Sequence, residues 1–518
     1  MSPTHALPVE PKSTIFNPDP SDLKKMVAEM PNAARSEFGN YNVTTKVLSR
    51  SKASTFIVTD HPEKHSGGAI STVEGARIAS LQNAYIKDQD MIVVDGYIGP
   101  DPKTNTAVRL IIERRFANIA AMQQQLYFPV PKAERDTFVP TLTVIYTPGL
   151  KAEGFPQERL IAVDLETNIT RVFNSDYFGE SKKGGLRMWN NLIHNKGGLA
   201  MHAGLKAIPT RDGEKTLLII GLSGTGKTTT TFTRQNGSRP IQDDFVAMLP
   251  SGEVLCSENG CFAKTYGLDA ESEPMIHGAV TKSIAYLENV SMDGRGHVNF
   301  FDESYTQNGR ATFPFDAIDG LPAPTTMPKA HAVLILNRNE TIIPCVAKLN
   351  AEQGAAYFML GETMGTSAGG AEEAGKALRV PGTNPFFPLN HALQGERFLE
   401  LQQRLGFDVY LLNTGWVGGP KGSAHSMKVK IRHTSAVVKA IAEGTITWTQ
   451  DNDFGYQVAS SVPGFEGDDR LLLQPKQAYE ATGRLPEYMN IVNRLKNERK
   501  TFLDKYPGLP DSLSEAVA

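Results

Sequence analysis

Hydrophobic residues occur in short runs separated by polar turns along most of the chain, as is typical of buried strands. Between these runs, longer segments carry apolar residues every three or four positions and predict helices. The runs predict strands over residues 90–96, 107–113, 141–146, 160–164, 170–173, 216–220, 253–256, 260–265, 297–301, 331–336 and 409–413. The periodic segments predict helices over residues 22–34, 115–126, 393–405, 435–443 and 486–504, the last as an exposed amphipathic helix. The mixture predicts an α/β protein.

Bulk composition excludes several classes of protein. The chain has 518 residues, which exceeds what one hydrophobic core supports, so two or three domains are expected. A net charge of −3 gives no electrostatic reason to expect a nucleic acid or an anionic membrane as partner. The N-terminus lacks the features of a signal peptide, and no apolar run reaches membrane-spanning length. Three cysteines favour buried, reduced thiols over a disulfide framework, so we expect a soluble cytoplasmic protein.

The strongest motif begins directly after the predicted strand 216–220. The string GLSGTGKT matches G-x-x-x-x-G-K-[ST] at every fixed position. Glycines let successive backbone N–H groups turn inward toward phosphate oxygens, and a helix beginning near Gly226 would add its positive end. Lys227 could then reach the β- and γ-phosphates, and Thr228 could bind Mg²⁺. The expected nucleotide-binding residues of this loop are Gly221, Leu222, Ser223, Gly224, Thr225, Gly226, Lys227, Thr228 and Thr229.

Two further segments adjoin this motif in the sequence. Residues 239–246 form an apolar run that ends in Asp243 and Asp244, which suits a strand with metal-binding acids at its carboxyl end. Upstream, residues 177–203 contain the lysine pair Lys182 and Lys183 and end in His202. This segment leads directly into the strand before the loop, so we expect it to border the same site.

Taken together, these motifs resemble those of the ATP-type phosphoenolpyruvate carboxykinases. YFGESKKG, LAMHA, GLSGTGKTT, IQDDF, ENGCFAKT, GRATFPFDAI and LLNTGW follow one another in the order and spacing of that family, over residues 50–438. The resemblance implies a mixed α/β N-terminal domain, residues 1–197, packed on a P-loop-containing mononucleotide-binding C-terminal domain, residues 198–518. It places the active site in the cleft between them.

The resemblance also implies a reaction, in which oxaloacetate and ATP give phosphoenolpyruvate, CO₂ and ADP, with Mg²⁺ and a second metal, typically Mn²⁺. It assigns Lys183, His202 and Asp244 as ligands of the second metal, and Lys227 and Thr228 to the nucleotide phosphates and Mg²⁺. A last set of assignments covers the acid substrate (Arg50, Tyr177, Lys183 and Arg310), the transferred phosphoryl group (Lys182 and Ser223), the vicinity of the metals (Asp243) and the nucleotide (Arg310 and Thr434).

Physical chemistry agrees with these roles. Decarboxylation of a β-keto acid leaves an enolate, which a divalent cation and nearby basic groups stabilise. Lys183 can bind a metal only as a neutral amine, so its pKa must lie well below about 10.4. Arg50 and Arg310 suit a dicarboxylate because a guanidinium holds a carboxylate through two hydrogen bonds.

The chain departs from the family pattern near the nucleotide. Phe245-Val246-Ala247-Met248 follows the two aspartates, where Glu-His-Gly-Trp is usual, and Lys428 and Val429 replace Arg and Ile of an Arg-Ile-Ser-Ile series. A Gly-Gly-Pro-Lys-Gly-Ser-Ala stretch precedes that series. Two alternatives therefore stay open beside an ATP-dependent carboxykinase: a kinase of another small carboxylate, or the same reaction with a different phosphoryl donor. A non-catalytic nucleotide-binding module is a third, against which the retention of Lys183, His202 and Asp244 argues. The sequence carries no signal for oligomeric state.

Overall fold

The structure, a computed structural model, describes residues 7–325, 327–365 and 375–518. The chain forms two compact units, each discontinuous in sequence. The first comprises residues 1–195, 256–326 and 386–389, and the second comprises residues 196–255, 327–385 and 390–518. The chain first passes from the first unit to the second between residues 195 and 196, two residues before the predicted boundary between residues 197 and 198. A single division there does not describe the units, however, because residues 256–326 pack with the first one.

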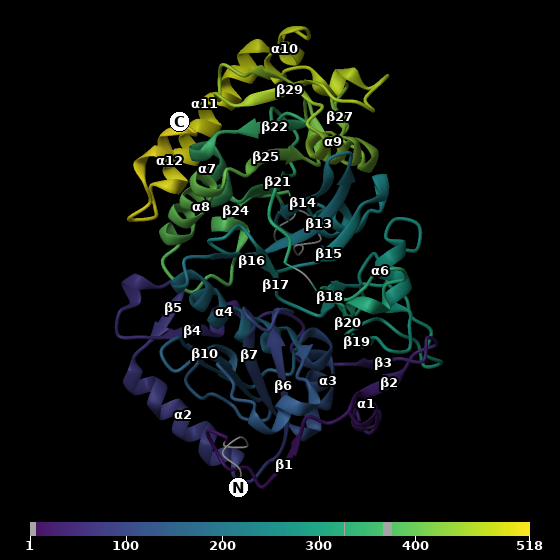
Figure 1. Cartoon of the computed structure of the whole chain (residues 1–518), viewed down its shortest axis with the longest axis vertical. Helices are drawn as coiled ribbons and strands as arrows, with labels where there is room; N and C mark the ends of the chain where they lie inside the picture. Colours follow the sequence, from purple (N-terminus) through teal and green to yellow (C-terminus); the bar gives the residue numbers. More distant parts are fainter. Residues whose placement is uncertain (1–6, 326, 366–374) are drawn as a thin grey trace. The chain divides into compact units, whose positions relative to one another are not determined.

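A nine-stranded mixed sheet organises the first unit (Figure 1). Its strand order is β1-β6-β7-β9-β11-β10-β4-β5, with β8 also paired to β6. The strands are β1 (Ser13–Phe16), β4 (Thr55–Val58), β5 (Gly68–Ile70), β6 (Asp90–Ile98), β7 (Thr106–Glu113), β8 (Phe128–Pro129), β9 (Leu142–Thr147), β10 (Leu160–Asp164) and β11 (Ile169–Phe173). Its main helices are α1 (Pro20–Ala28), α2 (Thr72–Ile86), α3 (Ala117–Leu126) and α4 (Gly179–Asn195). The predicted buried runs 90–96, 107–113 and 141–146 are confirmed as its central strands.

A second sheet explains why residues 256–326 belong to this unit. Its order is β18-β20-β19-β3-β2, so strands from both sequence segments pair directly. The strands are β2 (Ala33–Arg35), β3 (Tyr41–Val43), β18 (Gly260–Lys264), β19 (Tyr286–Glu288) and β20 (Arg310–Pro314), with α6 (Pro274–Val280) nearby in the chain. Parallel pairing of β19 with β3 joins segments separated by more than two hundred residues. Such pairing cannot be read from local sequence patterns.

The second unit contains an eight-stranded sheet of order β15-β13-β14-β21-β25-β22-β29-β28. Its strands are β13 (Ala203–Thr210), β14 (Gly213–Ile220), β15 (Arg239–Gln242), β21 (Ala332–Asn337), β22 (Val346–Leu349), β25 (Asp408–Asn413), β28 (Thr447–Gln450) and β29 (Gln457–Ser461). Because β14, β21 and β25 are parallel, their carboxyl ends meet at one edge, where α/β sheets bind ligands. Shorter strands are β12 (Leu199–Met201), β16 (Val246–Met248), β17 (Val254–Cys256), β23 (Glu362–Met364), β24 (Ala377–Arg379), β26 (Trp416–Val417) and β27 (Met427–Lys428).

Helices of the second unit flank this sheet (Figure 1). They are α5 (Lys227–Phe232), α7 (Ala351–Leu360), α8 (Ala392–Leu405), α9 (Ile431–Glu443), α10 (Pro475–Glu480), α11 (Leu485–Leu503) and α12 (Asp511–Glu515). The predicted helices 393–405 and 435–443 are confirmed. The predicted helix 486–504 is present as α11, yet one of its faces is buried and includes the fully enclosed Arg499. No helix within the described ranges combines the length and apolarity needed to cross a bilayer.

Two local predictions were wrong. The helix predicted over 22–34 ends at Ala28, because Pro31 disfavours helical geometry at the preceding Met30. Residues 297–301 form no strand but only an isolated bridge at Val298. There the Asp293 carboxylate accepts hydrogen bonds from the backbone N–H groups of residues 295 and 297, at 2.8 and 3.0 Å, and holds a tight turn.

Candidate active site

The glycine-rich loop Gly221–Lys227 connects β14 to α5 at the carboxyl edge of the parallel strands. Gly226 caps α5 with a φ of 90°, and Gly224 has a φ of 83°, a region that side chains other than glycine rarely adopt. Thr225 Oγ1 donates to the Leu222 carbonyl at 2.8 Å and closes the turn on itself. The strand, turn and helix expected from the motif are therefore all in place.

Lys227 and His202 converge on one carboxylate. Lys227 Nζ donates to Asp244 Oδ1 at 2.6 Å, and His202 Nε2 lies 2.8 Å from the same oxygen. The other ring nitrogen of His202 lies 3.0 Å from the Thr383 carbonyl, which fixes the ring orientation. Burial, together with the charge of Lys227, lowers the pKa of His202, so the imidazole is neutral and can bind a metal.

The neighbouring aspartate contacts the loop threonine. Thr228 Oγ1 donates to Asp243 Oδ1 at 3.3 Å, and Asp243 is buried directly after β15. This is the pair of oxygen donors expected for Mg²⁺ beside a bound triphosphate. Ser223 lies in the exposed part of the loop.

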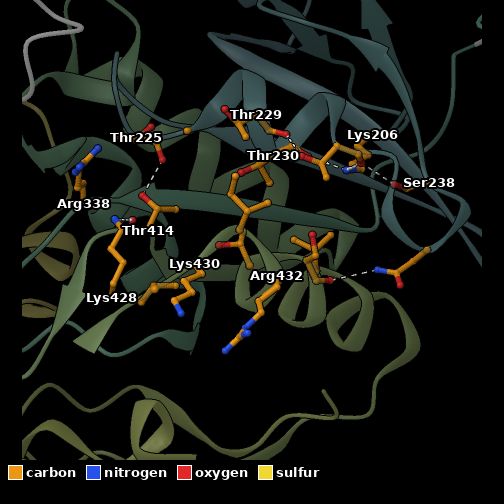
Figure 2. A pocket seen from close by; sticks show the side chains of 18 of the residues that line it. Lys206, Thr225, Thr229, Thr230, Ser238, Arg338, Thr414, Lys428, Lys430 and Arg432 are labelled. Atoms are coloured by element: carbon orange, nitrogen blue, oxygen red, sulfur yellow. Dashed lines mark hydrogen bonds between the residues drawn. The ribbon is translucent and has the colours of Figure 1, made fainter. Parts of the chain in front are cut away.

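A cavity of about 540 Å³ adjoins the loop (Figure 2). Two contacts tie its wall to the loop: Arg338 donates to the Gly224 carbonyl at 3.2 Å, and Thr414 donates to the Thr225 carbonyl at 2.7 Å. Within the wall, Lys428 donates to the Thr414 carbonyl at 3.1 Å. Thr229 and Thr434, two of the residues predicted to contact the nucleotide, also line the cavity. Among the described residues that line it, none carries a carboxylate, whereas five are basic: Lys206, Arg338, Lys428, Lys430 and Arg432. The cavity suits a polyanion.

The departures from the family pattern have structural counterparts here. The stretch before Lys428 forms the turn between β26 and β27, which pair so that Trp416 faces Lys428. The ammonium of Lys428 lies 5.7 Å from the Trp416 ring centroid. The second departure lies after the two aspartates: Phe245 is fully buried and leads into β16, an apolar strand paired with β12. The altered stretch 245–248 thus belongs to the buried core, and Lys428 and Val429 belong to the cavity wall.

Sequence reasoning missed Arg338, Thr414 and Lys206. Arg338 and Thr414 each follow a buried strand that runs parallel to its neighbours, β21 and β25 respectively. Their position at strand ends beside β14 was a usable signal, since ligands bind at that edge. Lys206 gave a different signal, a single lysine within the apolar run of β13.

In the first unit, Arg50 lies in an exposed turn whose following residue is firmly held. The Ser51 N–H donates to Glu180 Oε1 at 2.7 Å, and Arg159 donates to Ser51 Oγ at 2.9 Å. Glu180 is buried on α4, the helix that carries the lysine pair. The turn is therefore anchored to α4 rather than being a loose surface feature.

Lys183 occupies an unusual electrostatic environment on α4. Burial lowers its pKa to about 7, and the charges of Arg187, Arg310 and Arg50 act in the same direction, while Glu180 opposes them. The ammonium lies 5.2 Å from the ring centroid of the buried Tyr177. The neutral amine expected for a metal ligand is thus accessible near neutral pH.

Lys182 and Arg310 lie on the same aromatic ring. Lys182 Nζ is 5.7 Å and the Arg310 guanidinium carbon 5.2 Å from the Phe262 ring centroid. Lys182 pairs with Glu258 at 3.0 Å, and Arg310 donates to Asn308 at 2.8 Å. Arg50, Tyr177, Lys182, Lys183 and Arg310 therefore belong to one unit, as a mainly cationic cluster that suits a dicarboxylate.

Comparison with known proteins decides the family. The sequence profile described as phosphoenolpyruvate carboxykinase, in its ATP form, matches residues 12–468. The chain belongs to the phosphoenolpyruvate carboxykinase family. The resemblance inferred from the motifs is thereby confirmed, and the chain is an enzyme of the ATP-dependent type.

Individual relatives match over most of their length. A protein named phosphoenolpyruvate carboxykinase (ATP) 1 from Moorella thermoacetica is 30% identical over 492 residues, covering 91% of this chain and 90% of the relative. One from Alkaliphilus oremlandii is 30% identical and covers 96% of this chain and 94% of the relative. One from Sinorhizobium fredii is 31% identical over 450 residues, covering 84% of this chain and 81% of the relative.

Proposed function

We propose that this carboxykinase decarboxylates oxaloacetate and transfers the γ-phosphoryl group of ATP to the resulting enolate, using the residues described above. The observation that carries the assignment is the meeting of Lys227 and His202 on Asp244, directly beside the glycine-rich loop. A loop that only held a nucleotide would need Lys227, but it would not need a neutral imidazole on the same carboxylate.

The phosphate side is assigned to the loop. Its backbone N–H groups and Lys227 hold the β- and γ-phosphates and neutralise charge as the phosphoryl group moves. Ser223 contacts the transferred group. Thr434 and the rest of the cavity hold the nucleoside part.

The acid side is assigned to the cationic cluster of the first unit. Arg50 and Arg310 each offer a planar fork of donors to a carboxylate of oxaloacetate, and Tyr177 contacts the same substrate. Lys182 keeps its assignment to the transferred phosphoryl group. Its pairing with Glu258 and its position over Phe262 hold the ammonium in one place.

The donor atoms present fit the two divalent cations that the family implies. Thr228 and Asp243 offer hard oxygen ligands suited to Mg²⁺. His202 and Asp244 offer one nitrogen and one oxygen, a pair suited to Mn²⁺, and Lys183 keeps the role of a neutral amine ligand. Bound there, a divalent cation supplies positive charge that stabilises the enolate oxygen.

A coupled assay of phosphoenolpyruvate formation from oxaloacetate tests the proposal, with ATP, GTP or pyrophosphate as phosphoryl donor. We expect turnover with ATP that depends on oxaloacetate and on a divalent cation. ATP hydrolysis without phosphoenolpyruvate, or phosphorylation of a different carboxylate, would contradict the assignment of the acid substrate. Turnover with pyrophosphate but not with ATP would contradict the assignment of the nucleotide cavity.

A further inference from the structure

Lys206 is a buried lysine in the middle of an apolar strand. Its neighbours Leu205 and Ala207 on β13 are fully enclosed, and Lys206 itself is only 3% exposed. The pairing of β13 with β15 shifts register between Leu205 and Lys206. Such irregularities redirect a side chain and are common beside ligand sites. The lysine is one of the residues that line the nucleotide cavity (Figure 2).

The charge of Lys206 is only partly compensated. Nζ donates to the Thr230 carbonyl at 2.7 Å and to the Thr233 carbonyl. Within the described part of the chain no carboxylate acts on this ammonium, and burial alone lowers its pKa to about 8. Burying a cation without an acidic partner costs free energy, so proteins seldom do so without a functional reason. An ammonium has three N–H donors, and two of them are used.

Lys206 and the loop residue Thr225 line different sides of the cavity (Figure 2). Figure 2 shows Lys206 at one side of the cavity, with Arg338 and Thr225 at the other. The side chains of Ile208, Val429 and Val438 are almost completely buried and form an apolar part of the cavity wall. If the phosphates lie on the loop, the remaining volume receives the nucleoside. Apolar walls suit the faces of a flat ring, and a buried N–H suits an acceptor atom on its edge.

We propose that Lys206 determines nucleotide specificity by donating its third N–H to an acceptor atom of the nucleobase, a ring nitrogen in the case of adenine. The inference rests on the proposed function, because that function places the triphosphate on the loop. The simpler alternative is that Lys206 only ties the carboxyl end of α5 to the sheet. The two roles predict different effects on binding when the amine is removed. A contact with the base would weaken the binding of ATP but not of tripolyphosphate, whereas a purely structural role would affect both ligands alike.

Binding affinities measured by calorimetry distinguish the two roles of Lys206 without requiring turnover. The ligands are ATP, its 1-deaza, 3-deaza and 7-deaza analogues, and inorganic tripolyphosphate, which has no base. The proteins are the wild type, Lys206→Met, which keeps most of the side-chain volume, and Lys206→Arg, which keeps the charge. Lys439→Met, at an exposed lysine on α9, is the matched control. Thermal melting of each variant checks that it is folded.

We expect Lys206→Met to weaken ATP binding about tenfold, the effect of losing one hydrogen bond to a charged group, and to leave tripolyphosphate within about twofold. One deaza analogue should bind the wild type as weakly as ATP binds Lys206→Met, and should be insensitive to that substitution. Lys206→Arg should recover part of the ATP affinity, and Lys439→Met should behave as wild type. Equal losses for ATP and tripolyphosphate, or no loss for either, would overturn the inference. Wild-type protein that binds tripolyphosphate but not ATP would overturn the proposed nucleotide site as well.

Discussion

The Lys227 ammonium is 2.6 Å from Asp244 Oδ1 and 3.3 Å from the main-chain oxygen of the same residue. The residue expected to hold phosphate is therefore paired with a residue expected to hold metal. Both side chains are mostly buried, at 10% and 26% exposed, so the pair is only weakly screened by solvent. In the proposed function, binding of a nucleotide with its cation would replace this pairing by two others, Lys227 with phosphate and Asp244 with metal. The Lys227–Asp244 contact joins the loop to the segment that directly follows β15.

Lys227→Ala should lower kcat by several orders of magnitude, because the ammonium neutralises charge on the phosphoryl group as it transfers. The affinity for oxaloacetate should change little, since the acid is assigned to a different group of residues. Steady-state formation of phosphoenolpyruvate measures the first effect, and the KM for oxaloacetate measures the second. A variant that retains more than about a tenth of wild-type turnover would show that Lys227 does not take part in phosphoryl transfer.

Substitution of His202 by Gln or of Asp244 by Asn should abolish the response to Mn²⁺ before it abolishes nucleotide binding. Each change removes one metal donor and leaves the backbone N–H groups of the loop in place. Wild-type enzyme should show weak activity with Mg²⁺ alone and a sharp increase when micromolar Mn²⁺ is added. Titration of Mn²⁺ at fixed Mg²⁺, with ADP affinity measured in parallel, tests this. A flat Mn²⁺ response in the wild type would show that the second site is misassigned.

The sequence predicted the local structure around the glycine-rich loop because its signals are local. Strand, glycine turn, Lys227 and the start of α5 follow one another within fifteen residues, and the two aspartates come directly after the next strand, β15. The first unit was harder to predict. Its second sheet joins β3 to β19 across more than two hundred residues, and the contacts of Glu180 with Ser51 and of Glu258 with Lys182 also join segments that are far apart in the sequence. Side-chain pairs between distant segments leave no periodic trace in a single sequence.

Glu288 should make stability depend on pH. Burial raises the pKa of this carboxyl from 4.5 to about 8, although its Oε1 accepts a hydrogen bond from the Phe178 N–H at 2.8 Å. The folded protein therefore holds a proton that the unfolded chain releases between these two pKa values. The stabilising contribution is complete below pH 4.5 and is lost as pH rises through 8, at up to about 1.4 kcal/mol per pH unit.

Glu288→Gln should remove the contribution of Glu288 to the pH dependence of the free energy of unfolding. The amide keeps an oxygen acceptor for the Phe178 N–H and cannot ionise. Chemical denaturation of wild type and variant at several pH values between 5 and 8 measures the difference. The exposed Glu166→Gln serves as the matched control and should leave the slope unchanged. Parallel pH profiles for wild type and Glu288→Gln would show that Glu288 is ionised in the folded protein.

Arg50 is the assigned residue whose local sequence says least, since Ser49-Arg50-Ser51-Lys52 resembles an ordinary polar turn. In such a turn Arg50→Gln would change stability by a few tenths of a kcal/mol and activity hardly at all. The anchoring of Ser51 to Glu180 and Arg159 argues instead that the position of Arg50 matters. A charge-assisted hydrogen bond is worth about 1.5–3 kcal/mol, so kcat/KM for oxaloacetate should fall on the order of tenfold to a hundredfold or more in Arg50→Gln.

The same substitution should leave nucleotide affinity within about twofold, because the phosphates are assigned to Lys227 and the loop. Arg50→Lys should recover only part of the loss, since an ammonium cannot reproduce the two parallel hydrogen bonds of a guanidinium. Lys52→Gln, two residues away in the same exposed turn, is the control and should retain wild-type kinetics. Separate titrations of oxaloacetate and ATP give both constants. Equal losses for the two substrates would indicate a general folding defect and would remove Arg50 from the oxaloacetate site.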